Sequence, residues 1–201
     1  MEYDEVRYTL ARQICEALKF MYLKGLITPL TGNISVRIED TILTTPSSFV
    51  PRVRLKYELN PEDLVEVDLF GNIVRGGRPT TEIMMHLEIY RSCEKCGAIV
   101  HIHGVYAPLL TSKDRDRLFL DTEIKHILKP KICFVDEYVP RSEELAKAVT
   151  DSVKNGCEII YLQGHGVVTV SENLGIALEL AELAEVIAAR TIVKRLLDIA
   201  R

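Results

Sequence analysis

Two histidines stand one residue apart in a segment of strand-forming residues, AIVHIHGV. Side chains two positions apart in a strand point to the same face, so His101 and His103 should lie together, with Val100 and Ile102 on the other face. Paired imidazoles are good ligands for a divalent metal. Two partly buried histidines, each bonded to a backbone carbonyl, would fit the segment equally well, so the pair alone leaves both interpretations open.

A third histidine favours the metal. His165 lies between two glycines in LQGHGVVTV, where glycine lets the backbone bend closely around a side chain that reaches inward. Three imidazoles with a carboxylate or an open position form a known catalytic zinc site. Glu82, at the start of a predicted helix, is the candidate carboxylate. His86, one turn later, would either support the site from behind or lie on the helix surface.

Composition excludes several functional classes. The chain has 201 residues and a formal net charge of −4, which disfavours a protein built mainly to hold nucleic acid. No segment approaches the roughly 18 uncharged apolar residues of a membrane helix, and the first residues lack a signal-peptide pattern. We therefore expect a cytoplasmic protein with neither a nucleic-acid nor a membrane partner. Its length fits one domain spanning residues 1–201.

The five cysteines are odd in number and scattered, which disfavours a secreted disulfide scaffold. Cys93 and Cys96 form a lone C-x-x-C, and a structural zinc would need a second pair. We expect these two cysteines to be ordinary residues at the end of a helix. A redox or metal role is the less favoured alternative.

Apolar periodicity and turn signals predict helices and strands around these residues. Helices are expected at 4–24, at 82–93, from a cap at Ser142, and at about 174–200 after a cap at Asn173. Strands are expected at 34–38, 41–45, on both sides of the turn FGN, and at 98–103, 131–135, 158–163 and 167–170. The polar segment 112–117 is expected to be a loop. The pattern indicates an α+β domain with a largely antiparallel sheet.

Four motifs, in this order, carry a family resemblance: GNISVR, RPTTEIMMH, VHIH and the late GHG. Over roughly residues 5–190 the chain resembles the class II aldolase and adducin family. The resemblance implies a central, mainly antiparallel sheet flanked by helices in three α/β/α layers. It also implies a homotetramer with active sites at subunit interfaces. The wide apolar face of the last helix fits such an assembly, or equally an intrachain contact.

The resemblance also implies roles for individual residues. One Zn²⁺ per chain would be bound by His101, His103, His165 and Glu82, and Glu82 would act as the catalytic base. The substrate phosphate would be bound by Gly32, Asn33, Ser47, Ser48, Thr80 and Thr81. Hydroxyl groups, amides and backbone N–H groups near a helix start are suitable phosphate donors, although each of these residues could instead be an ordinary turn or cap.

The activity that the resemblance implies is reversible cleavage of a phosphorylated ketose, such as L-fuculose 1-phosphate, to dihydroxyacetone phosphate and an aldehyde such as L-lactaldehyde. The family's aldolases use a tyrosine of the neighbouring subunit to protonate the aldehyde oxygen. The corresponding segment here, LFLDTEIKH, contains no tyrosine. Tyr106 and Tyr138 are the nearest substitutes.

Other activities of the same family stay open. A methylthioribulose-1-phosphate dehydratase would use the same metal ligands. A pentulose-phosphate epimerase tends to lack the glutamate at position 82, so Glu82 disfavours it. A non-catalytic module like the head domain of adducin would be expected to lose zinc ligands, and all are present in this sequence.

Overall fold

The computed structural model describes residues 3–49 and 54–199. The strands are β1 (Asn33–Ile38), β2 (Thr41–Thr44), β3 (Val65–Asp68), β4 (Ile73–Arg75), β5 (Ala98–Ile102), β6 (Ile132–Val135), β7 (Ile159–Leu162) and β8 (Gly166–Ser171). Within these residues they form one eight-stranded sheet in the order β4-β3-β2-β1-β5-β8-β7-β6. Every neighbouring pair is antiparallel except β6 and β7, so the predicted, mainly antiparallel sheet is confirmed.

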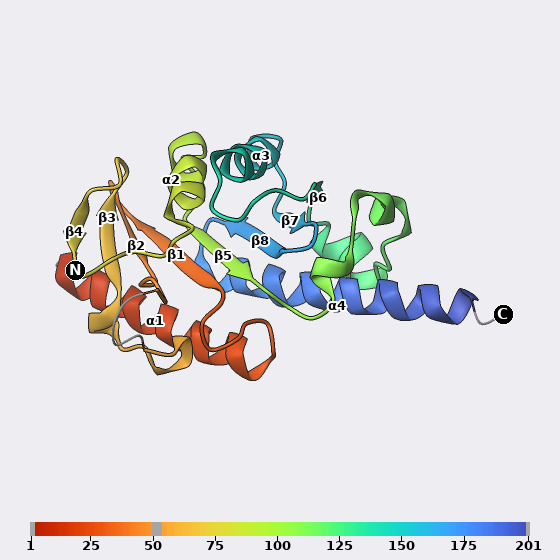
Figure 1. Cartoon of the computed structure of the whole chain (residues 1–201), viewed down its shortest axis with the longest axis horizontal. Helices are drawn as coiled ribbons and strands as arrows, with labels where there is room; N and C mark the ends of the chain where they lie inside the picture. Colours follow the sequence, from red (N-terminus) through yellow and green to blue (C-terminus); the bar gives the residue numbers. More distant parts are fainter. Residues whose placement is uncertain (1–2, 50–53, 200–201) are drawn as a thin grey trace.

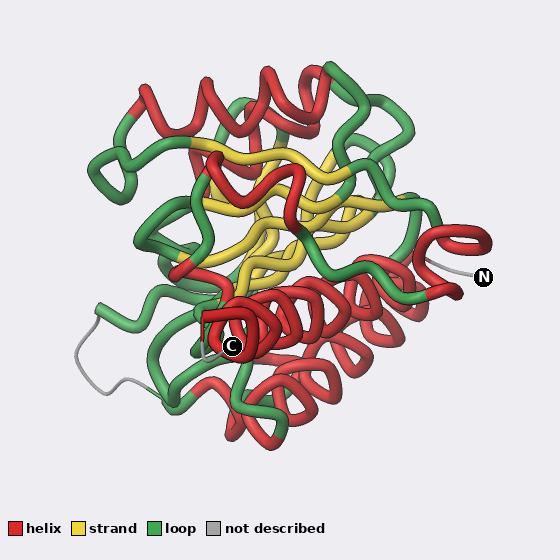
Figure 2. Tube along the Cα trace, turned by 90° about the vertical axis from the view of Figure 1, so that its right-hand side faces the viewer, coloured by secondary structure: helices red, strands yellow, loops and turns green. Residues whose placement is uncertain are grey.

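Helices cover both faces of this sheet. They are α1 (Tyr3–Leu23), α2 (Ile83–Ser92), α3 (Glu143–Lys154) and α4 (Leu174–Ile199). α1 and α4 pack on one face, and α2 and α3 on the other (Figures 1 and 2). Each face has its own apolar cluster, because side chains alternate between the faces along every strand. The α/β/α layers match the expected fold class.

β5 is one of the two central strands of the sheet, beside β1. Val100 and Ile102 belong to the apolar cluster under α1 and α4, whereas Ile99 belongs to the cluster under α2 and α3. His101 therefore faces the α2 side of the sheet, as the two-residue alternation predicted. In the register of the sheet it lies opposite Asn33 of β1 and Val168 of β8.

Local signals placed the helix ends correctly. The Ser142 side chain accepts a hydrogen bond from the backbone N–H of Leu145 at 3.1 Å, so it caps α3 as predicted. Asn173 caps α4 in the same way, through Ile176.

The expected loop at 112–117 is instead a short 3₁₀ helix with a capping box, because the Asp114 carboxylate accepts a hydrogen bond from the backbone N–H of Thr111 at the start of the helix. None of the described helices, the 26-residue α4 included, is long and apolar enough for a membrane span.

The expectation that Cys93 and Cys96 are ordinary residues is wrong in this structure. They form a disulfide with Cα atoms 5.4 Å apart, directly after α2. A second disulfide joins Cys133 to Cys157, with Cα atoms 5.9 Å apart, and Cys15 is left free and buried. The second pair forms because the parallel pairing of β6 and β7 brings residues 24 positions apart together, which cysteine spacing alone does not reveal.

The disulfides predict a thiol count. Protein purified without reductant and then denatured should react with a thiol reagent at one cysteine per chain, rising to five after reduction. Loss of the Cys133–Cys157 bond should lower the free energy of unfolding by about 3 kcal/mol, because it closes a long loop in the unfolded chain. Five reactive thiols before reduction would contradict both pairings.

Candidate metal centre and phosphate cavity

One end of the sheet gathers the segments that the sequence singled out. β1 and β8 begin there, and β2, β5 and β7 end there, because their neighbours run antiparallel. The turn from β7 to β8 carries His165, and the end of β5 carries His101 with His103 just beyond it. Antiparallel pairing of β5 with β8 therefore brings histidines more than sixty positions apart into one place.

The three imidazoles form a compact group. Ring centroids are 4.5 Å apart for His101 and His103, and 4.9 Å from each of these to His165. One ligand nitrogen from each ring lies within 4.8 Å of the others. That spacing is within reach of a single shared cation, so the structure brings together the three residues predicted as metal ligands.

His101 has its proton position fixed by the sheet. Its Nδ1 lies 2.9 Å from the carbonyl oxygen of Val167, which can only accept, so Nδ1 carries the proton. Nε2 is then a bare lone pair, buried and without a hydrogen-bond partner in the described chain. A metal-binding imidazole has this arrangement, with the second nitrogen held by a carbonyl.

Burial also keeps these rings neutral. It lowers the pKa of His101 well below the usual value, with His103 and His165 adding to the effect. The pKa of His103 falls to about 4, through burial and then His165, and that of His165 falls through burial and then Arg141. Neutral imidazole is the form that binds a metal. The residues present therefore fit a divalent cation.

Glu82 lies close to this group but outside it. It is the N-cap residue of α2, and its carboxylate is not among the clustered ligand atoms. One oxygen of this carboxylate, Oε2, is buried and has no hydrogen-bond partner among the described residues. Burial raises the pKa of Glu82, and Arg141 partly opposes this.

A cavity of about 140 Å³ adjoins the histidines and holds most of the predicted phosphate contacts. Its described lining includes Leu30, Thr31, Gly32, Asn33, Ser48, Phe49, Lys56, Thr80, Thr81, Glu82, His103 and Arg141. Ser47 is buried beside it, and its hydroxyl accepts from the backbone N–H of Phe49. Ser48 donates its hydroxyl to the carbonyl of Leu30 at 2.9 Å.

Backbone bonds hold the walls of this cavity together. The N–H of Ser47 donates to Arg78 and the N–H of Thr80 donates to Thr45, each at 2.9 Å. Gly32 has a φ of +75°, and a side chain there would meet Ile27 at 2.2 Å. Glycine at this position therefore lets the chain turn into β1 and present Asn33 to the cavity.

His86 supports the cavity from behind and does not lie on the helix surface. The ring is fully buried, and burial lowers its pKa to about 3, so it is neutral. Nε2 lies 2.6 Å from Asn33 Oδ1 and therefore donates, and Nδ1 accepts from the Ser35 hydroxyl at 2.6 Å. Tyr90 donates to the Ser35 carbonyl at 2.9 Å. With Oδ1 held, the amide N–H₂ is the group that Asn33 can offer to a ligand.

Sequence reasoning missed two cations in the cavity wall. Lys56 lies in KYELNP and Arg141 in a loop, where charged residues usually face solvent. Lys56 is nevertheless buried, and Arg141 has a φ of +69° with its guanidinium 4.6 Å above the ring of Phe49. No spacing pattern marks either residue.

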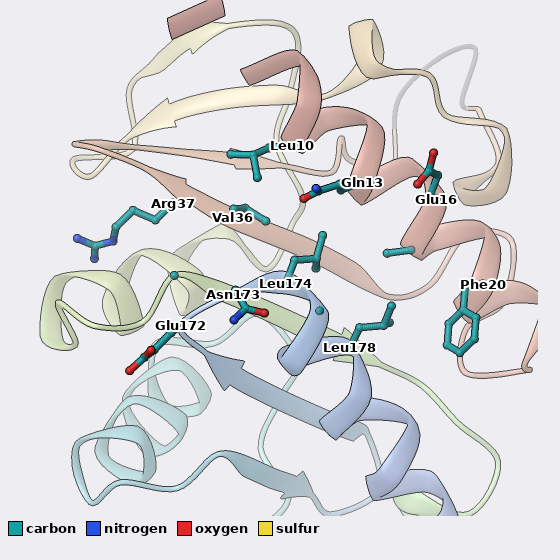
Figure 3. Close-up of a pocket in the computed structure, with 13 residues that line it drawn as sticks. Leu10, Gln13, Glu16, Phe20, Val36, Arg37, Glu172, Asn173, Leu174 and Leu178 are labelled. Atoms are coloured by element: carbon teal, nitrogen blue, oxygen red, sulfur yellow. The ribbon is translucent and has the colours of Figure 1, made fainter. Parts of the chain in front are cut away.

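A larger hollow of about 710 Å³ lies elsewhere, between α1, β1 and the start of α4 (Figure 3). Leucines from both helices line it, with Glu16, Arg37 and Glu172 around them. It holds none of the histidines. The smaller cavity, beside the three histidines and lined by hydroxyl and amide groups, is therefore the candidate site.

Comparison with known proteins decides the family. Residues 12–192 match the family described as Class II Aldolase and Adducin N-terminal domain. The chain belongs to this family. The resemblance carried by the four motifs is thereby confirmed.

Two family relatives cover nearly the whole chain. L-fuculose phosphate aldolase of Methanococcus maripaludis is 36% identical over 176 residues, which are 88% of this chain and 91% of the relative. The crystal structure of L-fuculose-1-phosphate aldolase from Thermus thermophilus superposes with a TM-score of 0.78 at 31% identity, covering 95% of this chain and 96% of the other.

A third relative has a different name. The 3-oxo-tetronate 4-phosphate decarboxylase of Pectobacterium atrosepticum is 30% identical over 181 residues, covering 83% of this chain and 78% of the relative. The family and the two relatives named as aldolases support an enzyme of the aldolase class. Class II aldolases depend on a metal, and the group of three histidines could bind one.

The hydrogen bonds of His86 predict a stability effect. His86→Phe should lower the free energy of unfolding by about 2–4 kcal/mol, because it leaves Asn33 Oδ1 buried without its donor and removes the nitrogen that accepts from the Ser35 hydroxyl. Denaturant unfolding measures this. His126→Phe, at an exposed position, is the matched control. An equal change in the free energy of unfolding for the two variants would mean that the hydrogen bonds of His86 do not stabilise the fold.

Proposed function

We propose that this protein is a zinc-dependent aldolase that cleaves a ketose 1-phosphate, L-fuculose 1-phosphate or a close analogue, to dihydroxyacetone phosphate and an aldehyde. The main support is the convergence of three neutral imidazoles beside a cavity rich in anion donors. The name of the 36% identical relative supports the same substrate.

His101, His103 and His165 would hold the Zn²⁺, and three imidazoles are a common ligand set for catalytic zinc. When bound, the ion draws electron density from the ketone oxygen of the substrate and stabilises the negative charge that cleavage leaves beside it. Burial keeps the three rings neutral, and the Val167 carbonyl holds the ring of His101 in place.

Glu82 carries the proton in this proposal. When the bond between carbons 3 and 4 breaks, the hydroxyl on carbon 4 gives up its proton and becomes the aldehyde oxygen, and the bonding electron pair stays on carbon 3, next to the ketone. Carbon 3 must then take up a proton to give dihydroxyacetone phosphate. A carboxyl whose pKa is raised by burial can hold this proton near neutral pH. We retain the sequence prediction that Glu82 is also the fourth metal ligand before substrate binds.

The phosphate would occupy the cavity beside Glu82. Asn33 offers its amide N–H₂, Thr80 and Thr81 offer hydroxyls close to the start of α2, and Gly32 and Ser48 line the same space. Such donors wrap the oxygens of a phosphate without needing a formal charge. Ser47 would act through the turn that it stabilises.

Decarboxylation of 3-oxo-tetronate 4-phosphate is the second candidate, favoured by the 30% identical relative. Loss of CO₂ from this substrate leaves an electron pair on the same carbon of the same three-carbon phosphate. Protonation then gives dihydroxyacetone phosphate again. The two reactions therefore differ only in the group that leaves, and the same cavity suits both.

We also propose that residues 1–201 form one domain and that the protein is a cytoplasmic homotetramer with active sites at its subunit interfaces. One sheet connecting all the described strands supports the single domain. Exposed apolar side chains near the site and at the end of α4 support the assembly: Val105, Leu109, Leu196, Leu197 and Ile199. In Figure 1 the last turns of α4 reach beyond the sheet.

Product analysis separates the candidates. With L-fuculose 1-phosphate we expect equal amounts of L-lactaldehyde and dihydroxyacetone phosphate. With 3-oxo-tetronate 4-phosphate we expect little CO₂. CO₂ release from 3-oxo-tetronate 4-phosphate with little L-lactaldehyde from L-fuculose 1-phosphate would mean that the protein is a decarboxylase. Water loss from methylthioribulose 1-phosphate, with neither L-lactaldehyde nor CO₂ formed from the other substrates, would mean that it is a dehydratase. Dihydroxyacetone phosphate alone is not diagnostic, since two of these reactions release it.

Replacing the proposed base tests its role. Glu82→Gln should lower kcat by about a hundredfold or more while the protein stays folded, because the amide cannot carry the proton. Glu88→Gln on the exposed side of the same helix is the control and should change kcat little. Unchanged turnover in the Glu82 variant would mean that another group moves the proton.

A further inference from the structure

Lys56 brings a buried ammonium group into the wall of the phosphate cavity. It begins the short 3₁₀ helix Lys56–Glu58, is 3% exposed, and lines the cavity beside Asn33, Thr80 and Thr81. The phosphate donors predicted from the sequence are all neutral. Lys56 therefore adds a positive charge to a set of neutral hydrogen-bond donors.

Its position is fixed at both ends. The backbone N–H of Lys56 donates to the carbonyl of Pro29 at 2.8 Å, and Nζ donates to the carbonyl of Pro46 at 2.9 Å. Pro46 forms a β-bridge with Pro79, so it lies where the segment of Ser47 and Ser48 meets the segment of Thr80 and Thr81. The ammonium group is thus held at the junction of the two segments that should contact the phosphate.

This cation has no counter-ion among the described residues. An ammonium group has three N–H donors, and the Pro46 carbonyl is the one hydrogen-bond acceptor that Nζ has in the described chain. Burial lowers the pKa of Lys56 to about 8, so most molecules still carry the charge at pH 7. A buried, unpaired charge is costly, and an anion bound in the cavity would remove that cost.

We propose that Lys56 binds the substrate phosphate and makes the cavity selective for a dianionic phosphoryl group. The identity of the substrate rests on the proposed function, whereas binding of a phosphate beside Lys56 does not. Arg141 also lines the cavity, but it is exposed and stacked on Phe49, so solvent screens its charge more strongly.

A purely structural role for Lys56 can be separated from this one. Glutamine can still donate a hydrogen bond to the Pro46 carbonyl but carries no charge. If Lys56 serves only to hydrogen-bond the Pro46 carbonyl, Lys56→Gln should bind phosphate as tightly as the wild-type protein does. If the charge of Lys56 binds phosphate, Lys56→Gln should weaken phosphate binding as much as Lys56→Met does.

The test is calorimetric titration of the metal-loaded protein with inorganic phosphate. Lys56→Gln and Lys56→Met should each weaken phosphate binding about tenfold or more, as expected for loss of a charged hydrogen bond. Lys147→Gln, at an exposed lysine of α3, is the matched control and should bind as wild type does. With a phosphorylated ketose, KM should rise in the Lys56 variants much more than kcat falls.

A measurement on the wild-type protein covers the case in which the variants do not fold. A small acylating reagent that reacts with amines should modify Lys56 more slowly when phosphate is present, and should modify Lys147 at an unchanged rate. Mass spectrometry measures the extent of modification at each lysine. Equal phosphate affinity in Lys56→Gln, or no protection of Lys56, would overturn the proposal. Phosphate binding that depends on Lys56 in a protein without aldolase activity would keep this proposal and refute the proposed function.

Discussion

The position of β5 between β1 and β8 is the constraint on which the site depends. Its ladder with β8 sets His101 beside the turn that carries His165, and its ladder with β1 sets Asn33 opposite His101. A slip of one residue in either ladder would turn His101 to the α1 and α4 face. The apolar cluster under α1 and α4 resists such a slip, since it would lose the buried side chains of Val100 and Ile102 and take up the imidazole of His101.

Burial then gives the gathered groups their chemistry. It keeps the three imidazoles neutral, raises the pKa of Glu82 and leaves the Lys56 ammonium without a counter-ion in the described chain. These groups share a desolvated region in which a cation and a phosphate dianion would each find unsatisfied partners. Uncompensated polar groups reduce stability, so their concentration at one end of the sheet is typical of a binding site.

The sequence predicted the parts of the structure that local interactions decide. Both hairpins, the caps at Ser142 and Asn173, and the shared face of His101 and His103 follow from side-chain alternation and turn chemistry. Features that need distant segments were missed. The parallel pairing of β6 and β7 creates the Cys133–Cys157 disulfide, and the packing of a short 3₁₀ helix buries Lys56. Convergence of His165 with the other two rings was expected from its glycine-flanked position at a strand end together with the family resemblance, because no local spacing encodes it.

The most direct test of the account is X-ray absorption spectroscopy on the purified protein, together with a measurement of its metal content. We predict about one zinc per chain, with three imidazole nitrogens at about 2.0 Å in the first coordination shell and one oxygen ligand. His165→Ala should remove one imidazole from that shell. A protein without bound metal that also fails to take up zinc, or zinc bound mainly through sulfur, would contradict a metal centre built on these histidines.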